Sequence, residues 1–189
     1  MSDPLAHALG KLAPILDTLG IQYAVVGSLA SSAHGVYRAT ADGDLLAQIA
    51  PPHARQLAIA LGKDWYADAD AMERAIRDGR SFNLIHIPTA MKIDVFPATT
   101  EFHATQLGRA TPITVFPDEE AMRLPVASPE DVLLAKLQWY QAGGEVSDKQ
   151  WGDVTGILAT NPGLDFAYME AWARRLGVSH LLARAIVLP

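Results

Sequence analysis

The sequence predicts an α/β core followed by a helical C-terminal part, and two observations support this prediction. Over residues 1–125, amphipathic segments alternate with short apolar runs of strand length, which are bounded by glycine and proline. From Ser128 onward, the chain shows helical segments that begin with capping residues. We therefore expect a mixed sheet flanked by helices over residues 1–125 and a helical subdomain over residues 126–189.

Each element of the first part has its own signal. Leucines at helical spacing predict a helix over residues 4–19 that ends at Gly20, and the apolar run 22–27 predicts a buried strand. Ser28 is a good N-cap residue, which predicts a short helix ending near Gly35. The further elements expected are a strand at 42–50, helices at 53–62 and 68–79, strands at 81–88 and 91–97 joined as a hairpin, and a proline-kinked edge strand at 109–117.

Capping residues define the helices of the second part. Ser128, Ser147 and Asp165 each precede a helical segment, and Gly177 is positioned to end the third of these helices. The last predicted helix covers residues 179–188.

Composition excludes several classes of function. The net charge is −6, so the chain as a whole does not resemble a nucleic-acid-binding protein, and the absence of cysteine excludes disulfides and thiolate sites. The N-terminal segment lacks the pattern of a signal peptide, and no run approaches the roughly 18 apolar residues of a membrane span, so we expect a cytoplasmic protein. Arg74, Arg77 and Arg80 could form a basic patch, but a solvated helix face is the simpler interpretation.

Two carboxylates open the predicted strand at 42–50. Side chains alternate along a strand, so Asp42 and Asp44 lie on the same face, roughly 7 Å apart along the chain. Like charges at the edge of a core have two explanations: either they are solvated turn residues, or a cation lies between them.

Two further features are suited to phosphate. Gly27 and Ser28 lie at a strand-to-helix junction, where backbone N–H groups can face an anion. Arg38 carries a permanent charge on a planar fork that matches phosphate oxygens.

A third carboxylate lies in the predicted strand 91–97. Lys92 and Asp94 share one face of this strand. If this strand neighbours the strand of Asp42 and Asp44, three carboxylates converge, and their hard oxygen atoms suit Mg²⁺.

These residues resemble a known family. The segment "VGSLASSAHGVYRATADGDLL", followed by "MKIDVF", is similar to the DNA polymerase β-like nucleotidyltransferases, and most of all to the bacterial minimal and toxin-type (AbiE-toxin-like) members. The resemblance covers residues 20–97 and extends more weakly through "SPEDVLLAKLQWY". It implies the nucleotidyltransferase fold and a Mg²⁺-dependent transfer of a nucleoside monophosphate from an NTP to a hydroxyl group, with pyrophosphate leaving.

The resemblance also implies roles for particular residues. Gly27 and Ser28 would hold the triphosphate, and Asp42 and Asp44 would coordinate the metal ions. Asp94 would hold the second metal ion and help to deprotonate the acceptor hydroxyl.

Further residues are predicted to contact the nucleotide or to assist. Arg38, Lys92 and Lys136 are the predicted nucleotide contacts, and Asp153 matches an aspartate of the toxin-type members. For Lys136, a snorkelling side chain on a helix is an equal alternative.

The chain departs from the family at Gly43, where a bulky aliphatic residue is usual. Glycine loosens a strand, so we expect less rigid positioning of the aspartate pair and consider a weakly active member. One alternative is therefore a binding module of a toxin–antitoxin or similar complex, with an antitoxin-like protein as partner. An antibiotic-modifying enzyme is another alternative, and the acceptor stays open between tRNA, a protein and a small molecule.

Overall fold

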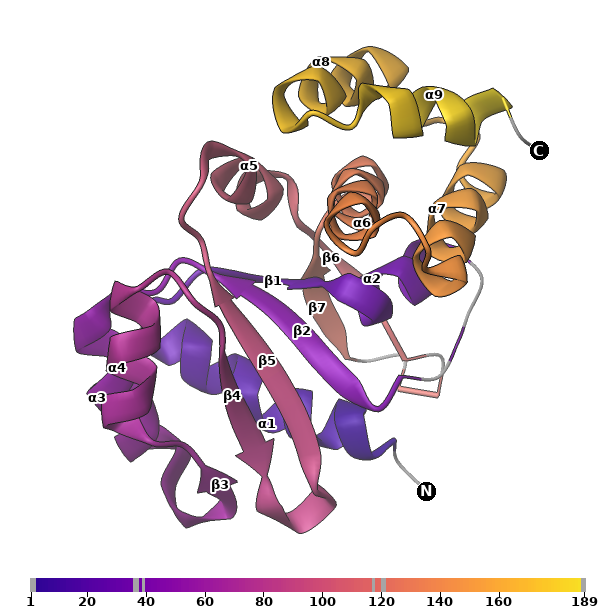
Figure 1. The fold of residues 1–189 in the computed structure, drawn as a ribbon. Helices are drawn as coiled ribbons and strands as arrows, with labels where there is room; N and C mark the ends of the chain where they lie inside the picture. The colour runs from indigo at the N-terminus through magenta and orange to yellow at the C-terminus, as the bar shows by residue number, and fades with distance from the viewer. Residues whose placement is uncertain (1–2, 36–37, 39, 117, 120–121, 188–189) are drawn as a thin grey trace. The chain divides into compact units, whose positions relative to one another are not determined.

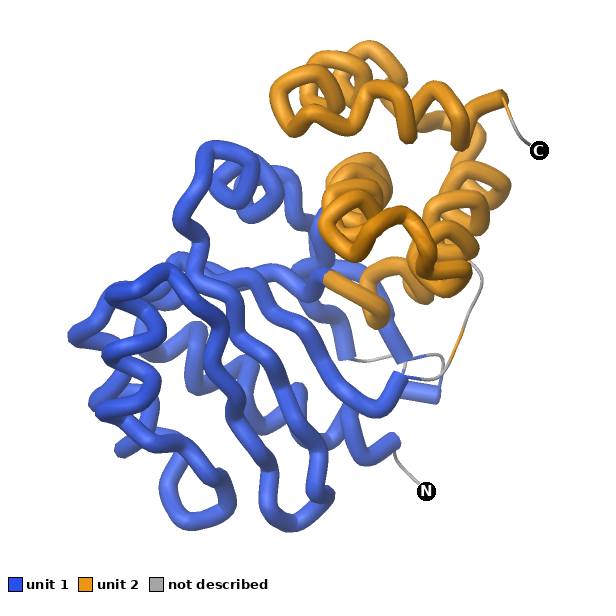
Figure 2. Tube along the Cα trace, viewed as in Figure 1, with its two compact units in different colours: residues 1–26, 40–127 blue, residues 27–39, 128–189 orange. Residues whose placement is uncertain are grey.

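The computed structural model describes residues 3–35, 38, 40–116, 118–119 and 122–187. The chain divides into two compact units, coloured separately in Figure 2. Unit 1 comprises residues 1–26 and 40–127, and unit 2 comprises residues 27–39 and 128–189. The helical unit thus includes a segment from the first part of the chain, whereas the predicted division was a single boundary after residue 125.

Unit 1 is built on a mixed sheet with the strand order β3-β4-β5-β2-β1-β7-β6 (Figure 1). The strands are β1 (Tyr23–Val26), β2 (Asp42–Ala47), β3 (Trp65–Tyr66), β4 (Phe82–His86), β5 (Met91–Pro97), β6 (Thr111–Thr114) and β7 (Arg123–Val126). Strand β2 pairs antiparallel with β1 and parallel with β5. The strands that carry the three aspartates are therefore neighbours, as the metal-site hypothesis requires.

Helices cover both faces of this sheet. They are α1 (Pro4–Thr18), α3 (Pro51–Leu61), α4 (Ala69–Arg77) and α5 (Glu101–Arg109), with short 3-10 turns at Gly62–Asp64 and Ile87–Thr89. Helix α1 lies behind the sheet in Figure 1, and its Leu5 and Leu9 approach Gly43 of β2. Helix α5 packs on the opposite face, where Leu107 forms a buried cluster with Ala24 and Leu46. One face of β2 is thus fully buried, and the other is buried only along part of its length.

Three elements of unit 1 were missed by the sequence prediction. Strand β3 has only two residues, and β7 has four residues that include a proline, so neither is long enough to give a clear strand signal. Helix α5 is rich in polar residues, although Thr100 caps it by accepting a hydrogen bond from the backbone N–H of His103. The predicted edge strand at 109–117 is confirmed as β6, which lies at the end of the sheet.

Unit 2 is helical within its described residues. It contains α2 (Gly27–His34), α6 (Pro129–Ala142), α7 (Asp148–Thr160), α8 (Phe166–Leu176) and α9 (Ser179–Val187). The predicted caps are confirmed, because Ser128, Ser147 and Asp165 each accept a hydrogen bond from a backbone N–H in the first turn. The predicted cap at Ser28 is wrong: α2 already begins at Gly27, so Ser28 lies inside the helix.

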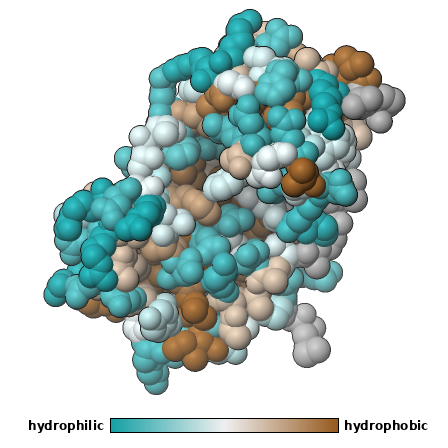
Figure 3. All heavy atoms as spheres, in the orientation of Figure 1, coloured by the Kyte–Doolittle hydropathy of each residue, from teal (hydrophilic) through white to brown (hydrophobic). Residues whose placement is uncertain are grey.

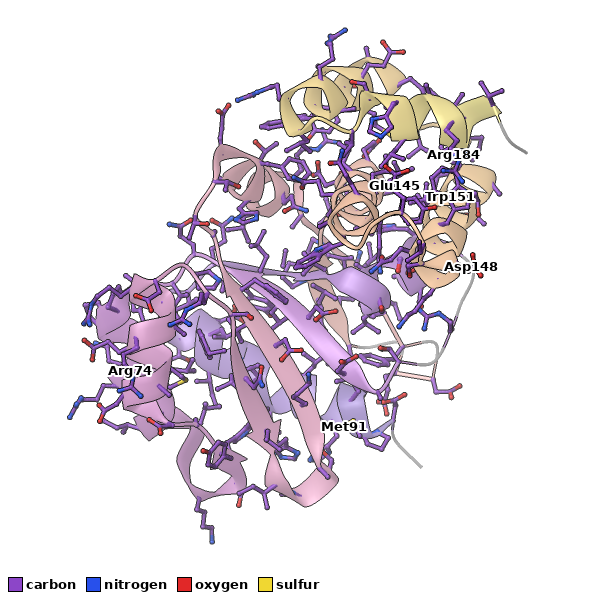
Figure 4. The ribbon with its side chains drawn as sticks, viewed as in Figure 1. Arg74, Met91, Glu145, Asp148, Trp151 and Arg184 are labelled. Atoms are coloured by element: carbon purple, nitrogen blue, oxygen red, sulfur yellow. The ribbon has the colours of Figure 1, made fainter. Side chains whose placement is uncertain are left out.

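An arginine-centred cluster connects the last helix of unit 2 to the rest of that unit (Figure 4). The guanidinium carbon of Arg184 on α9 lies 4.3 Å from the ring centroid of Trp151 on α7. Its Nη1 lies 3.9 Å from Glu145, in the turn between α6 and α7. A cation over an indole ring adds to the packing of an exposed helix.

The arginines of α4 and the turn after it lie on an exposed surface. Figure 4 labels Arg74 on α4, and hydrophilic residues dominate the region of α3 and α4 in Figure 3. Arg77 lies 2.6 Å from Glu73, and Arg80 lies 2.5 Å from Asp78. This pairing agrees with a solvated helix face rather than with a basic patch. No helix among the described residues combines the length and the apolar character needed to cross a membrane.

Candidate functional site

The register of the sheet places the aspartates in rows across neighbouring strands. Asp44 of β2 pairs with Asp94 of β5, and Asp94 pairs in turn with Asn83 of β4. Neighbouring strands are about 4.8 Å apart, so the Asp44 and Asp94 side chains leave adjacent backbone positions on the same face. In the next row, Asp42 pairs with Lys92.

The cover provided by α5 stops short of these rows. Leu46, two residues after Asp44, belongs to the buried cluster with Leu107 of α5. Asp42 and Asp44 are only partly buried. The polar end of this face therefore begins where the apolar cover from α5 ends.

Lys92 bridges two of the three carboxylates. Its Nζ lies 2.8 Å from Oδ2 of Asp94 and 3.8 Å from Oδ2 of Asp42. The hydrogen bond to Asp94 raises the pKa of Lys92, and the negative charges of Asp94, Asp42 and Asp44 act in the same direction. The Thr40 hydroxyl also lies 3.2 Å from Oδ1 of Asp42. The acidic cluster is thus organised around an ammonium group.

The three aspartates suit a divalent cation in ligand type and in their alignment across β2 and β5. Asp42, Asp44 and Asp94 present hard carboxylate oxygens on one face, which is the ligand type that Mg²⁺ prefers. As the side chains stand, no group of three or more Asp, Glu or His residues in the described chain is arranged to hold a metal ion. Lys92 already places a cation against two of these carboxylates, so metal loading requires its side chain and theirs to reorient.

Gly43 is a packing feature of the sheet, which changes the interpretation of the departure noted in the sequence. A Cβ added at Gly43 would lie 3.3 Å from Cδ1 of Leu5 and 3.8 Å from Cδ1 of Leu9. The space of a side chain is therefore filled by α1. Gly43 is buried and keeps its place in the pairing with Ile93 of β5, so the ladder that aligns the aspartates is continuous through the glycine.

Unit 2 brings three of the predicted residues together. Lys136 of α6 is only 4% exposed, and its Nζ lies 2.8 Å from Oδ2 of Asp153 on α7. Nη2 of Arg38 lies 3.6 Å from Oδ1 of the same carboxylate. Lys136 is therefore not a snorkelling residue. The Asp153 side chain is 13% exposed and contacts both cations.

Two buried polar atoms, one in this cluster and one on α7, make no hydrogen bond within the described part of the chain. Nη2 of Arg38 and Oε1 of Gln150 are buried, and neither has a hydrogen-bond partner among the described residues. An unsatisfied buried donor on a guanidinium is costly unless a ligand or water pairs with it.

Gly27 and the acidic residues at the start of α6 have local structural roles. Gly27 begins α2 with φ of +62°, a left-handed conformation that glycine adopts without strain. Glu130 and Asp131, the acidic pair at the start of α6, connect this helix to α8. The backbone N–H of Asp165 donates to Glu130, and the Tyr168 hydroxyl lies 2.5 Å from Oδ1 of Asp131.

Sequence reasoning missed Thr40, Asn83 and Gln150. Thr40 precedes the aspartate pair by two residues and contacts Asp42. The alternation of side chains along 81–88 could have placed Asn83 on the polar face, because its neighbours Phe82 and Leu84 are apolar. No pattern in the sequence singles out Gln150.

Comparison with known proteins gives matches in structure alone. No protein-family model matches the chain, and no curated protein matches it significantly. The fold is similar to that of an antigenic nucleotidyltransferase-like protein from Paracoccidioides brasiliensis, with a TM-score of 0.56 and 22% identity over 97% of this chain and 92% of that one. It is also similar to ANT(2'')-Ia in complex with adenylyl-2''-tobramycin, with a TM-score of 0.53 and 13% identity over 93% and 98% of the two chains. The solution structure of the antibiotic-resistance factor ANT(2'')-Ia matches with a TM-score of 0.51 and 13% identity over 95% and 97%. The chain therefore has the nucleotidyltransferase fold.

Proposed function

We propose that this protein is a Mg²⁺-dependent nucleotidyltransferase that transfers a nucleoside monophosphate from an NTP to a hydroxyl acceptor. The observation that carries the proposal is the register of Asp44 with Asp94, with Asp42 on the same face of β2. Three carboxylates share this face with one ammonium group, that of Lys92. The buried apolar cluster under α5 ends before the aspartates, and Asp42 and Asp44 are only partly buried.

Each carboxylate has a role in the proposed reaction. Asp42 and Asp44 bind magnesium, and Asp94 binds it too and accepts the proton of the acceptor hydroxyl. Bound magnesium supplies Lewis-acid neutralisation of the triphosphate. Asp94 is the least exposed side chain of the Lys92 bridge, at 17%, which suits a group that must hold a proton away from bulk water.

The predicted nucleotide contacts are cationic or backbone groups. Support for Arg38 comes from its buried Nη2, which has an ion-pair contact of 3.6 Å with Asp153 but no hydrogen bond among the described residues, so that a phosphate oxygen could accept one. Lys136 and Arg38 both contact the Asp153 carboxylate, so Lys136 is also assigned to the phosphates of the nucleotide. Gly27, Ser28 and Lys92 keep the assignment that the resemblance gave them.

The acceptor is left open between tRNA, a protein and a small molecule. The ANT(2'')-Ia complex contains adenylyl-2''-tobramycin. For this chain, an aminoglycoside is one candidate small-molecule acceptor. A cytoplasmic location remains part of the proposal.

A second candidate is a binding module of a toxin–antitoxin or similar complex, with weak catalysis and an antitoxin-like partner. The observation that favours it is the arrangement of Lys92, which neutralises part of the cluster without a metal ion. The absence of a ready metal-holding group among the described residues agrees with it.

The proposal is tested by calorimetric titration of the protein with each of the four NTPs, with and without Mg²⁺. We expect Mg²⁺-dependent binding of at least one NTP by the wild type and its loss in Asp44→Asn. The chain offers a matched control, because Asp68 and Asp70 form a second Asp-x-Asp that belongs to the start of α4. Asp70→Asn changes the charge by the same amount at an exposed position and should bind the NTP normally.

Three results would contradict the proposal. Equal NTP binding with and without Mg²⁺ would contradict the role of the metal ion. NTP binding retained by Asp44→Asn would contradict the assignment of the site to the three aspartates. Failure of the wild type to bind any NTP would favour the binding module.

A further inference from the structure

We infer that Lys92 is the resident counter-cation of the acidic cluster, and that a divalent ion binds only by displacing its ammonium group. This inference rests on the proposed function, because it concerns the same three carboxylates. It assigns Lys92 a positioning role in metal loading, in addition to its predicted contact with the nucleotide.

The geometry places the ammonium against the carboxylates expected to hold the metal ion. Lys92 lies two residues before Asp94, so their side chains share a face of β5, and it pairs in register with Asp42 of β2. Its Nζ is within 2.8 Å of one carboxylate and 3.8 Å of the other. A magnesium ion on the same oxygens and this ammonium group would compete for the same lone pairs.

The charges explain why a counter-cation is needed. Three carboxylates leave adjacent positions of β2 and β5, and their mutual repulsion opposes the ionised state that metal binding requires. The Lys92 ammonium lies against two of these carboxylates, from both strands, and its positive charge offsets their repulsion.

The side chain can also leave. Lys92 is 42% exposed and Asp42 is 44% exposed, so the ammonium has a path into solvent. Leaving breaks its hydrogen bond to Asp94, which is 17% exposed and is the carboxylate that the metal ion would then neutralise. A lysine has a flexible four-carbon stem, which allows the head group to move away while the backbone of β5 stays paired. The ammonium can thus hold two of the carboxylates together and still be exchanged for another cation.

The experiment is a Mn²⁺ titration without nucleotide, with free Mn²⁺ measured by electron paramagnetic resonance. We expect Lys92→Gln and Lys92→Met to lower the Kd for Mn²⁺ about three- to tenfold relative to the wild type, since a partly exposed ion pair no longer competes. Lys92→Arg keeps the charge and should not lower the Kd. Lys63→Gln removes an exposed lysine elsewhere in unit 1 and is the matched control for net charge.

A second readout is thermal unfolding, which also shows that each variant folds. Without metal, Lys92→Gln should unfold at a lower temperature than the wild type, and added Mn²⁺ should stabilise the variant more than the wild type. Equal or weaker Mn²⁺ binding by the folded Lys92 variants overturns this inference and leaves the proposed function intact. Absence of Mn²⁺ binding in the wild type and in every variant overturns both.

Discussion

Replacing Gly43 with a larger residue is expected to destabilise the protein through its contact with α1. The ideal Cβ lies 3.3 Å from Cδ1 of Leu5, closer than ordinary van der Waals contact, which begins at 3.4 Å. For Gly43→Ala, this small overlap opposes the roughly 0.5–1 kcal/mol gained by removing glycine from a strand, so the net change stays within about 1 kcal/mol. For Gly43→Ile, the extra methylenes overpack the interface and should cost about 1–3 kcal/mol.

A double-mutant cycle with Leu5 tests this packing directly. Leu5 is 2% exposed, so Leu5→Ala alone should cost about 2–5 kcal/mol by opening a cavity. In the Gly43→Ile/Leu5→Ala double variant, the isoleucine occupies part of that cavity. We expect the double variant to be at least about 1 kcal/mol more stable than the sum of the single changes.

The assay is urea denaturation followed by circular dichroism, with the free energy of unfolding extrapolated to water. Additive effects of the Gly43 and Leu5 substitutions would refute the reasoning, because they would show that the leucine does not fill the space of the missing side chain. A loss of Mg²⁺-dependent NTP binding in the folded Gly43→Ala variant would refute the view that the glycine serves packing alone.

Two further predictions concern buried charges. Asp153→Asn leaves the Lys136 ammonium buried beside a neutral amide, which should lower the free energy of unfolding, measured by urea denaturation, by about 3–5 kcal/mol. Lys136→Met should cost less, because the Asp153 carboxylate still has Arg38 as an ion-pair partner. Equal costs would contradict this order. Burial lowers the pKa of His86 below 6.5, so the unfolded chain binds a proton first and stability should fall as the pH drops below 6.5. The slope of unfolding free energy between pH 7 and pH 5 should be smaller in His86→Phe, and an unchanged slope would exclude His86 as its source.

Much of the fold could be predicted from local patterns. The helix caps at Ser128, Ser147 and Asp165 are confirmed because capping depends on a side chain and the backbone three residues away. The hairpin of β4 and β5 is likewise a local feature, since a short turn at 87–89 joins the two strands. The mixed sheet and its flanking helices could be predicted because segments with helical spacing of apolar residues alternate with short apolar runs of strand length.

Elements without a local signal could not be predicted. Strand β7 has only four residues and contains Pro125, so its alternation is too short to identify it, and it exists as a strand because β1 and β6 pair with it on both sides. Ser28 was expected to cap α2, but the helix already includes Gly27, which has a φ of +62°.

The sequence by itself determined which chemical groups share a face, because the period of two along a strand places Asp42 with Asp44 and Lys92 with Asp94. Tertiary structure alone decided that β2 and β5 are parallel neighbours in the register that aligns Asp44 with Asp94. It also decided that Lys92 bridges carboxylates from two strands, and that Leu5 fills the space at Gly43. These contacts join residues far apart in the chain, and their geometry depends on how the whole sheet and its helices pack.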